Sequence, residues 1–292
     1  MNAASERGKK DGALILVGTP IGNLGDLAPR AIEALRDADV IAAEDTRRTR
    51  ALLSHAGVRA RHRLRAVHGH NERRLAAAIV EEVRKGARVV YATDAGMPGI
   101  SDPGERLVRA CLDAGLAVEV VPGPSALLAG LVLSGLPTQR FVFEGFLPRK
   151  GRARSERLAA IAAEVRTVVL FESPVRVAAT LDDLATACGP GRAVAVAREL
   201  TKRFEDVWRG TLGDATADSG VSGARGEYVL VVGPAPSSPV EVGDEGLDEA
   251  VDAALDSGLS TRDAAAQVAA ELAVPKRRAY DAATRLARVR RG

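Results

Sequence analysis

The chain has 292 residues, of which 46% are hydrophobic and 27% are charged, and its formal net charge is +3. This length allows about two domains that each bury a core, and the composition is that of a globular protein. No run of about 20 apolar residues is present, which excludes a membrane-spanning helix, so we expect no membrane partner. Aromatic residues form only 3% of the chain, which argues against a base-stacking surface for single-stranded nucleic acid.

The amino-terminal residues and the cysteines indicate where the protein works. Residues 1–12 lack the apolar segment of a secretory signal, and we expect them to form a short disordered lead. Cys111 and Cys188 lie far apart within helical patterns, which fits buried thiols in a reducing compartment better than a disulfide. We therefore expect a cytoplasmic protein.

Short apolar runs alternate with helical patterns through residues 13–137, which predicts an α/β domain with largely buried strands. Strands are expected at 13–18, 39–45, 88–94 and 117–123. Helices are expected at 27–38, 71–86 and 103–115, where apolar residues recur at helical spacing. Asp102 directly precedes Pro103 and is expected to cap the last of these helices.

The same rhythm starts again after the Gly-Leu-Pro turn at residues 135–137. Residues 138–233 are predicted to form a second α/β domain, with strands at 140–146, 167–173, 193–199, 205–212 and 227–233. Residues 234–246 are rich in Pro, Ser and acidic side chains, a composition typical of a linker.

Residues 247–292 are different in kind, because nearly all of them follow a helical pattern. They predict a helix, a short turn and a second helix that Pro275 opens and that carries Lys276, Arg277 and Arg278 at its start. A helix-turn-helix motif places such a basic helix start against nucleic acid. The alternative is a three-helix bundle that docks on the catalytic body or on a dimer partner.

The unusual loops of both predicted domains follow strands. In open α/β sheets, ligands gather outside the carboxyl ends of the strands, where helix N-termini present free amides. The loops in question span residues 17–27, 93–104, 121–130, 171–176 and 197–205. We expect them to build one ligand site.

These loops lack the motifs of three common kinds of site. Residues 18–23 have neither the GxGxxG spacing nor the Gly-Lys-Ser/Thr ending of a phosphate-binding loop. Asp94 and Asp102 have no further acid or histidine at a helpful interval, so we expect no catalytic metal. The strand-end serines stand in no G-x-S-x-G elbow, which argues against a nucleophilic enzyme.

Six motifs occur in order along the chain: GTPIGNLGD, AEDTRRT, DAGMPGISDPG, PGPSA, FESPVR and ARELTK. Their order and spacing resemble the tetrapyrrole methylase-like superfamily and, within it, the bacterial enzymes that 2′-O-methylate a cytidine ribose in the decoding region of 16S rRNA. The resemblance covers residues 13–233, and the C-terminal helices resemble an appendage of many members. It implies two α/β domains with S-adenosylmethionine between them, a homodimer, and 16S rRNA within the small ribosomal subunit as partner.

The resemblance also assigns residues to the cofactor. It implies that Pro20 borders the methyl-transfer cleft. From the first domain, it places Asp94, Gly96, Met97, Ile100, Ser101, Ser125 and Ala126 along the cofactor. From the second domain, it adds Leu170, Phe171, Arg198, Glu199, Glu227 and Tyr228. Met97 departs from the Thr or Asp of relatives, so only backbone contact is expected there.

Methyl transfer to a ribose hydroxyl is an in-line displacement in which the protein aligns two ligands and removes one proton. The strand-end loops offer Glu44, Asp45, Glu172, Glu199 and Lys202 for this role. We expect Glu199 to accept the proton, with Lys202 polarising the hydroxyl or binding phosphate and Glu44 as the second candidate. The alternative is that these acids form ion pairs with Arg47, Arg176 and Arg198 and fix the loops.

Arginines cluster in two segments, at residues 59–65 and 149–157. Arg59, Arg61, Arg63 and Arg65 alternate, so an extended strand would present all of them on one face. Such stripes suit a polyanion, although a solvated edge strand and a charged loop are the alternative. The predicted RNA-binding residues are Arg47, Arg61, Arg63, Arg149, Lys150, Arg152, Lys276 and Arg277.

Two other functions stay open on the sequence. One is methylation of a small tetrapyrrole, which the arginine clusters and the basic helical tail disfavour. The other is a non-catalytic RNA-binding regulator on a degenerate methylase body, which the intact loops disfavour.

Overall fold

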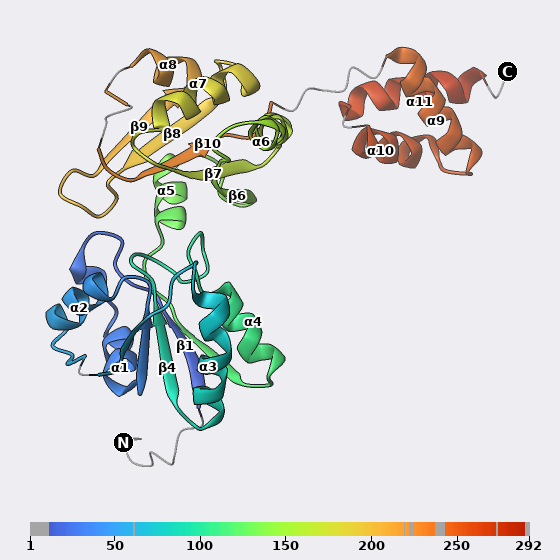
Figure 1. The fold of residues 1–292 in the computed structure, drawn as a ribbon. Coiled ribbons are helices and arrows are strands. Elements are labelled where there is room, and N and C mark those ends of the chain that lie inside the picture. Colours follow the sequence, from blue (N-terminus) through green and yellow to red (C-terminus); the bar gives the residue numbers. More distant parts are fainter. Residues whose placement is uncertain are drawn as a thin grey trace, which may run out of the picture. The chain divides into compact units, whose positions relative to one another are not determined.

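The computed structural model describes residues 12–60, 62–218, 220–221, 225–236, 243–272 and 274–289. The chain forms two compact units, residues 1–235 and 236–292. The first unit contains two five-stranded sheets, and the second is helical (Figure 1). Residues 1–11 of the expected lead, residues 237–242 of the expected linker, and Arg61 lie outside the described residues.

The first sheet is parallel throughout and has the order β3-β2-β4-β1-β5. Its strands are β1 (Ala13–Val17), β2 (Val40–Ala43), β3 (Leu64–Ala66), β4 (Arg88–Ala92) and β5 (Ala117–Val121). The strands expected at 13–18, 39–45, 88–94 and 117–123 are confirmed. Strand β3 was not among the expected strands; it lies at the edge of the sheet and includes Arg65, the last of the four alternating arginines.

Helices cover both faces of this sheet, as an all-parallel sheet requires. They are α1 (Pro29–Asp37), α2 (Thr46–His55), α3 (Glu72–Arg84) and α4 (Glu105–Asp113). Leu35 of α1 and Leu53 of α2 pack on Ile15 and Ile41 in one core. Ile79 of α3 and Leu107 of α4 pack on Leu14 and Tyr91 in the other. The central strands are therefore buried on both faces, which explains their continuous apolar sequence.

The second sheet is mixed and has the order β6-β7-β10-β8-β9. Its strands are β6 (Phe141–Phe146), β7 (Thr167–Glu172), β8 (Ala193–Arg198), β9 (Asp206–Thr211) and β10 (Tyr228–Val232). All of them were expected. Strand β10 runs antiparallel to both β7 and β8, so its first residues lie beside the carboxyl ends of those strands. Helices α6 (Arg152–Ala163), α7 (Val177–Cys188) and α8 (Leu212–Ala217) pack on one face.

Helix α5 (Ala126–Ser134) covers the other face of the second sheet, with Leu131 packed on Val169, Ala195 and Val229 (Figure 1). Gly130 allows the close approach, since a Cβ there would lie 2.6 Å from Val229 Cγ1. The boundary predicted at residue 137 counts this helix with the first domain, whereas its packing joins it to the second sheet. The chain thus crosses between the sheets at residues 122–125, just before α5.

The described part of the second unit consists of α9 (Asp244–Asp256), α10 (Thr261–Glu271) and α11 (Lys276–Val289). Ser260 caps α10 by accepting a hydrogen bond from Asp263 N at 3.2 Å. Leu247, Val251, Val268 and Ala279 lie in the shared core of the three helices. Among the described residues, no helix has the length and apolarity needed to cross a membrane.

Candidate active site

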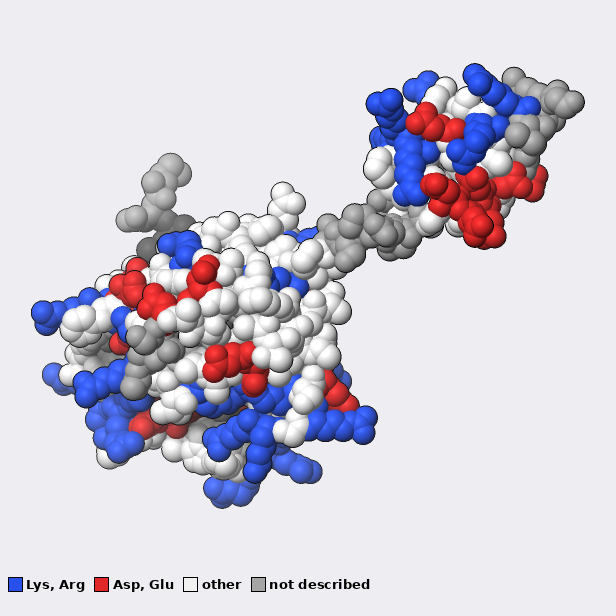
Figure 2. All heavy atoms as spheres, turned by 90° about the horizontal axis from the view of Figure 1, so that it is seen from above, with Lys and Arg blue, Asp and Glu red and all other residues white. Residues whose placement is uncertain are grey.

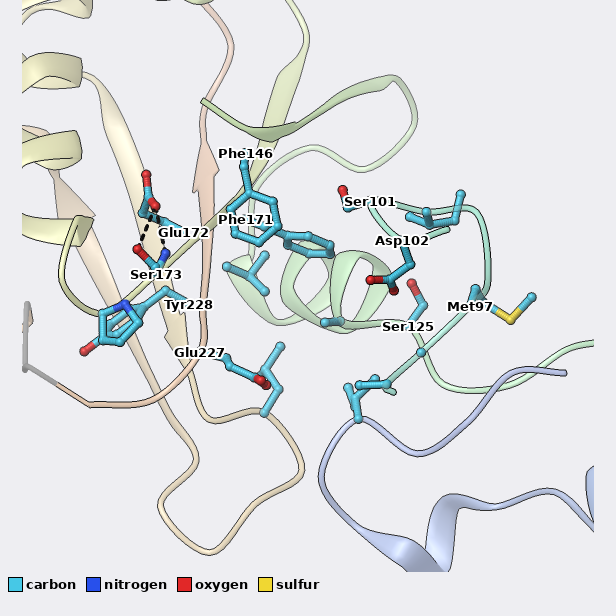
Figure 3. Close-up of a pocket in the computed structure, with 18 residues that line it drawn as sticks. Met97, Ser101, Asp102, Ser125, Phe146, Phe171, Glu172, Ser173, Glu227 and Tyr228 are labelled. Atoms are coloured by element: carbon cyan, nitrogen blue, oxygen red, sulfur yellow. Dashed lines mark hydrogen bonds between the residues drawn. The ribbon is translucent and has the colours of Figure 1, made fainter. Parts of the chain in front are cut away.

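A pocket of about 290 Å³ opens where the strand-end loops of the two α/β domains meet (Figure 3). This volume lies just below the range of about 300–1,000 Å³ that is typical of small-molecule sites. One wall comprises Ile21, residues 95–97 and 100–102, and residues 125–126 at the start of α5. The opposite wall comprises Phe146, residues 171–174, Leu200 and residues 227–229. The strand-end loops thus meet around one pocket, as expected, and its use as a ligand site stays a prediction.

Backbone contacts fix the loops of the first domain beneath the pocket. Thr19 N donates to Gly96 O at 2.9 Å and Gly96 N donates to Thr19 O at 3.1 Å, which joins the loops after β1 and β4. A Cβ on Gly18 would lie 2.6 Å from Gly123 N. Glycine is needed at that contact because the loops after β1 and β5 meet backbone to backbone.

The loop after β4, residues 94–104, forms most of the first wall. Gly96, Gly99 and Gly104 have φ angles of +80°, +82° and +133°, which favour glycine. Ser101 also has a positive φ, +61°, which is uncommon for a residue with a side chain. Gly99 N donates to Pro103 O at 3.1 Å and closes the loop on itself. The glycines and prolines thus shape a fixed backbone wall.

The start of α4 corrects one expectation about this loop. The cap is Glu72 of α3, whose Oε1 accepts hydrogen bonds from Gly104 N, Arg106 N and Leu107 N at 2.9, 3.1 and 3.3 Å. The predicted cap by Asp102 is wrong, because the helix has no side-chain cap from its neighbouring residues. The Asp102 carboxylate lies on the pocket wall instead.

The second domain contributes two aromatic rings to the pocket lining, and a carboxylate that already has hydrogen-bond and ion-pair partners. The rings of Phe146 and Phe171 meet edge to face with centroids 5.8 Å apart, and Phe146 is 52% exposed. Glu172 is buried and accepts from Thr180 Oγ1 at 2.7 Å, and it pairs with Arg176 at 3.3 Å. Glu172 is therefore engaged in holding the loop after β7.

Two carboxylates near the pocket have raised pKa values. Burial, followed by the charges of Glu44, Asp94 and Glu227, raises the pKa of Asp102 to about 7. Burial likewise raises the pKa of Glu44. The local potential is therefore negative and favours a cationic ligand.

The expected catalytic residues Glu199 and Lys202 lie in the loop after β8, residues 199–205, and neither lines the pocket. Lys202 Nζ contacts Glu199 Oε1 at 2.8 Å and Glu227 Oε2 at 2.9 Å. The hydrogen bond from Lys202 lowers the pKa of Glu199. Burial opposes the charge of Lys202, but its two carboxylate partners raise its pKa on balance. This arrangement fits the ion-pair alternative for both residues.

The other expected ion pairs are also present in part. Arg47 pairs with Asp45 at 2.8 Å, and Arg198 lies 3.8 Å from Asp206. Asp94 accepts a hydrogen bond from Asp45 N at 3.0 Å and lies 3.5 Å from Arg48. Glu44, the second catalytic candidate, accepts a hydrogen bond from Asp94 N at 3.3 Å and lies outside the pocket lining.

The predicted cofactor residues divide into two groups. Those that line the pocket are Gly96, Met97, Ile100, Ser101, Ser125, Ala126, Phe171, Glu227 and Tyr228. Those that do not are Pro20, Asp94, Leu170, Arg198 and Glu199. Leu170 is fully buried in the core of the second sheet, because alternate residues of β7 face opposite ways and Phe171 takes the pocket side.

Sequence reasoning missed several lining residues, which are Ile21, Ala95, Asp102, Phe146, Ser173, Pro174, Leu200 and Val229. Phe146 carried a signal, since it ends a strand in a chain with few aromatic residues. Asp102 carried none, because the motif that contains it is equally typical of a helix cap. Among the described residues, no group of three or more His, Cys, Asp or Glu side chains could hold a metal ion.

The basic side chains of the two arginine clusters differ in whether they have partners within the protein. Arg63 donates to Arg36 O at 3.0 Å and Ala38 O at 2.6 Å, so it satisfies the carboxyl end of α1. Arg65 pairs with Glu82. Arg149 and Lys150 are exposed just before α6, where Arg152 pairs with Glu156 at 2.6 Å.

The surface charge is uneven in both units. In the view of Figure 2, Lys and Arg side chains of the larger unit gather along one margin beside a largely uncharged area. In the helical unit, a large acidic area occupies one side of the visible face, while the basic side chains lie mainly on the other side with one acidic patch among them. Lys276 and Arg277 are exposed at the start of α11, while Arg278 pairs with Asp244 of α9 at 2.8 Å.

The two-sheet fold and the pocket between strand-end loops define a methylase of a known class. Residues 13–216 match the family described as Tetrapyrrole (Corrin/Porphyrin) Methylases, and the chain belongs to this family. A solved structure of uroporphyrin-III C-methyltransferase from Thermus thermophilus, complexed with S-adenosylhomocysteine, shares the fold with a TM-score of 0.54 and 24% identity. It covers 76% of this chain and 97% of that one.

Closer relatives carry a more particular name. The chain is 44% identical over 271 residues to ribosomal RNA small subunit methyltransferase I of Synechocystis sp., covering 92% of this chain and 96% of the relative. It is 51% identical over 225 residues to the protein of the same name from Xylella fastidiosa, covering 76% of this chain and 81% of the relative.

Proposed function

We propose that the protein transfers a methyl group from S-adenosylmethionine to the 2′-hydroxyl of a cytidine in the decoding region of 16S rRNA. The observation that carries this proposal is the 44% identity over 92% of the chain to a relative named as a small subunit rRNA methyltransferase. A match of that length necessarily extends into the helical unit. A tetrapyrrole methylase would need neither that unit nor exposed basic side chains beside the cleft.

The residues of the pocket fit S-adenosylmethionine, which supplies an electrophilic methyl group on a positively charged sulfur. The negative potential from Asp102, Glu227 and nearby acids favours that positive charge. Gly96 and Ala126 leave room for a ligand to approach the backbone. The rings of Phe146 and Phe171 offer an apolar surface to an adenine.

Different parts of the chain suit the cofactor and the RNA. Ser125 accepts from Leu128 N at 3.4 Å and caps α5, and residues 125–126 at the start of this helix line the pocket. Such amides suit the carboxylate of the cofactor. Arg149 and Lys150 lie only a few residues beyond Phe146 of the pocket and suit RNA phosphates.

The direct test incubates the purified protein with isotopically labelled S-adenosylmethionine and small subunits that lack the modification. We expect one ribose methyl group on a decoding-region cytidine, located by mass spectrometry of rRNA fragments. Naked 16S rRNA and a tetrapyrrole are assayed in parallel. Labelling of the tetrapyrrole alone would replace the proposed substrate, and cofactor binding without transfer to any of them would favour a regulator.

The basic segment before α6 offers a separate test of the RNA partner. We expect R149E/K150E to weaken binding to small subunits about tenfold and to reduce the salt slope of log K by about 2. The matched control is R84E/K85E, which changes the charge equally at the end of α3, beside the amino end of β4. Equal effects of both pairs would indicate non-specific electrostatics.

We propose further that a second copy of the chain covers the exposed face of α5. Leu128 and Val132 are 51% and 71% exposed and lie four residues apart, so they share one side of the helix. Helix α5 is apolar all round while only one side of it packs on the second sheet. We expect light scattering to give a dimer for the native protein and a monomer for V132E. A native monomer would contradict this.

A further inference from the structure

We infer that Asp102 accepts the proton of the hydroxyl group that is methylated. This inference rests on the proposed function and deepens it, because it names the residue that completes the transfer. It also moves the role from Glu199, which the sequence favoured, to a carboxylate on the opposite wall of the pocket.

The position of Asp102 is the first argument. It lines the pocket together with its neighbours Ile100 and Ser101, and Figure 3 shows its carboxylate pointing into the pocket beside the Ser125 side chain. Across the pocket lie Phe171 and Glu227 of the second domain. A hydroxyl brought into this space can reach the carboxylate directly, as general base catalysis requires.

The second argument is that the protein does not use this carboxylate for anything else. In the part of the chain that the structure describes, no hydrogen bond or ion pair to Asp102 is found. The other acids near the pocket are engaged: Glu172 by Thr180 at 2.7 Å, Asp94 by Asp45 N at 3.0 Å, and Glu199 by Lys202 at 2.8 Å. A partly buried carboxylate without a partner costs stability, so its retention favours a functional role.

The third argument is that α4 does not need Asp102. Glu72 reaches from α3 and accepts hydrogen bonds from three amides at the start of α4. The loop is also closed by the Gly99 N to Pro103 O hydrogen bond, and Pro103 fixes φ directly after Asp102. The loop therefore fixes the position of the Asp102 carboxylate without forming a hydrogen bond to it.

The surroundings of Asp102 make it a suitable base near neutral pH. Burial, followed by the charges of Glu44 after β2, Asp94 after β4 and Glu227 before β10, raises the pKa of Asp102 to about 7. A base is most effective when its pKa lies near the working pH. Glu199 is the weaker candidate, because the ammonium of Lys202 lowers its pKa.

The step balances in atoms and charge. The hydroxyl oxygen forms a bond to the methyl carbon while its proton passes to a carboxylate oxygen of Asp102. The carbon–sulfur bond breaks and its electron pair stays on sulfur, which leaves as a neutral thioether. One positive and one negative charge disappear together, and Asp102 then returns its proton to water.

The test compares the native protein with D102N and with the control E105Q, which changes an exposed acid three residues further on in α4. We expect D102N to lose about 100-fold to 1,000-fold in the single-turnover rate of methyl transfer. Its affinity for S-adenosylhomocysteine, measured by calorimetry, should stay within about threefold, and E105Q should behave as the native protein.

Two further measurements test the role of Asp102 independently of the D102N rate. Carbon-13 NMR of the ligand-free native protein should show an aspartate carboxyl that titrates near neutral pH, and D102N should lack that signal. In D102E, a longer carboxylate should restore part of the rate. An unchanged rate in D102N, or a loss of cofactor affinity that matches the loss of rate, would overturn the inference.

The outcomes also separate this inference from the proposed function. If the native protein methylates no rRNA, the proposed function fails whatever Asp102 does. If the native protein methylates rRNA and D102N does so equally well, the function stands and only the role of Asp102 is lost.

Discussion

The 94–104 loop and the 199–205 loop both follow strands and both carry acidic residues. They differ in whether the carboxylate has a partner within the protein. In the first, Asp102 is held by backbone geometry and points into the pocket. In the second, Glu199 binds Lys202, which also binds Glu227. An acid at a strand end is thus available for chemistry only where its own loop leaves it without a partner.

The two loops also differ in which residues adopt positive φ angles. The 94–104 loop turns largely through glycines, whereas the 199–205 loop places Glu199 and Thr201 at φ angles of +52° and +65°. The side chains of Glu199 and Thr201 accept hydrogen bonds, which a glycine at these positions could not do. Thr201 Oγ1 accepts from Asn23 N of the first domain at 3.2 Å, and Glu199 Oε1 accepts from Glu227 N at 3.1 Å. The second loop therefore joins the two α/β domains.

The largest effect that we expect tests the glycine geometry of the 94–104 loop. G104A places a side chain at φ +133°, with its Cβ 3.1 Å from Tyr91 Cε1 and 3.2 Å from Gly99 N. We expect a loss of about 2–4 kcal/mol in the free energy of unfolding, measured with urea. G69A is the control, since the nearest atom to its Cβ would be 3.9 Å away. Equal stability of the two variants would show that the loop tolerates side chains.

The next effect concerns the unpartnered carboxylate. The pKa of Asp102 is raised in the fold from its ordinary 3.8 to about 7, so the unfolded chain ionises first and native stability falls as pH rises between these values. D102N removes this penalty. We expect it to be more stable than the native protein by about 1–2 kcal/mol at pH 8, after allowance for partial exposure, and nearly equal at pH 4. A stability difference independent of pH would contradict a raised pKa.

A smaller effect should follow from removing the cation of the 199–205 loop. K202M leaves Glu199 and Glu227 without their shared partner, and we expect a loss of about 1 kcal/mol at pH 7. Because the fold lowers the pKa of Glu199 and raises that of Lys202, this loss should shrink in acid as Glu199 protonates and in strong base as Lys202 loses its charge. Thermal unfolding across pH measures it, with K150M as the exposed control.

The smallest effect concerns catalysis and contrasts directly with D102N. E199Q keeps an oxygen that can accept from Lys202, so we expect the rate of methyl transfer to fall less than about tenfold. A 100-fold loss with normal cofactor affinity would return the role of proton acceptor to Glu199 and remove the contrast between the two loops.

The sequence predicted the fold class, the strands of both sheets except β3, and the meeting of the strand-end loops, because periodicity and loop position are local properties. It could not predict which acids are free. Glu72 caps a helix that begins 33 residues later, and Arg63 satisfies carbonyls of α1 more than 20 residues earlier. Such pairings depend on how the elements pack, so the same acidic loop sequence is compatible with a cap, an ion pair or a base.

The place of α5 has a consequence for how the pocket can open. The helix packs on the second sheet, and the chain reaches it through residues 122–124, Pro-Gly-Pro. A rotation of the second domain as a rigid body would therefore carry Ser125 and Ala126 along and leave the 94–104 loop behind. The pocket would then open between Asp102 and Ser125. In such a rotation the two parts of the first wall, which are neighbours in space, would move apart.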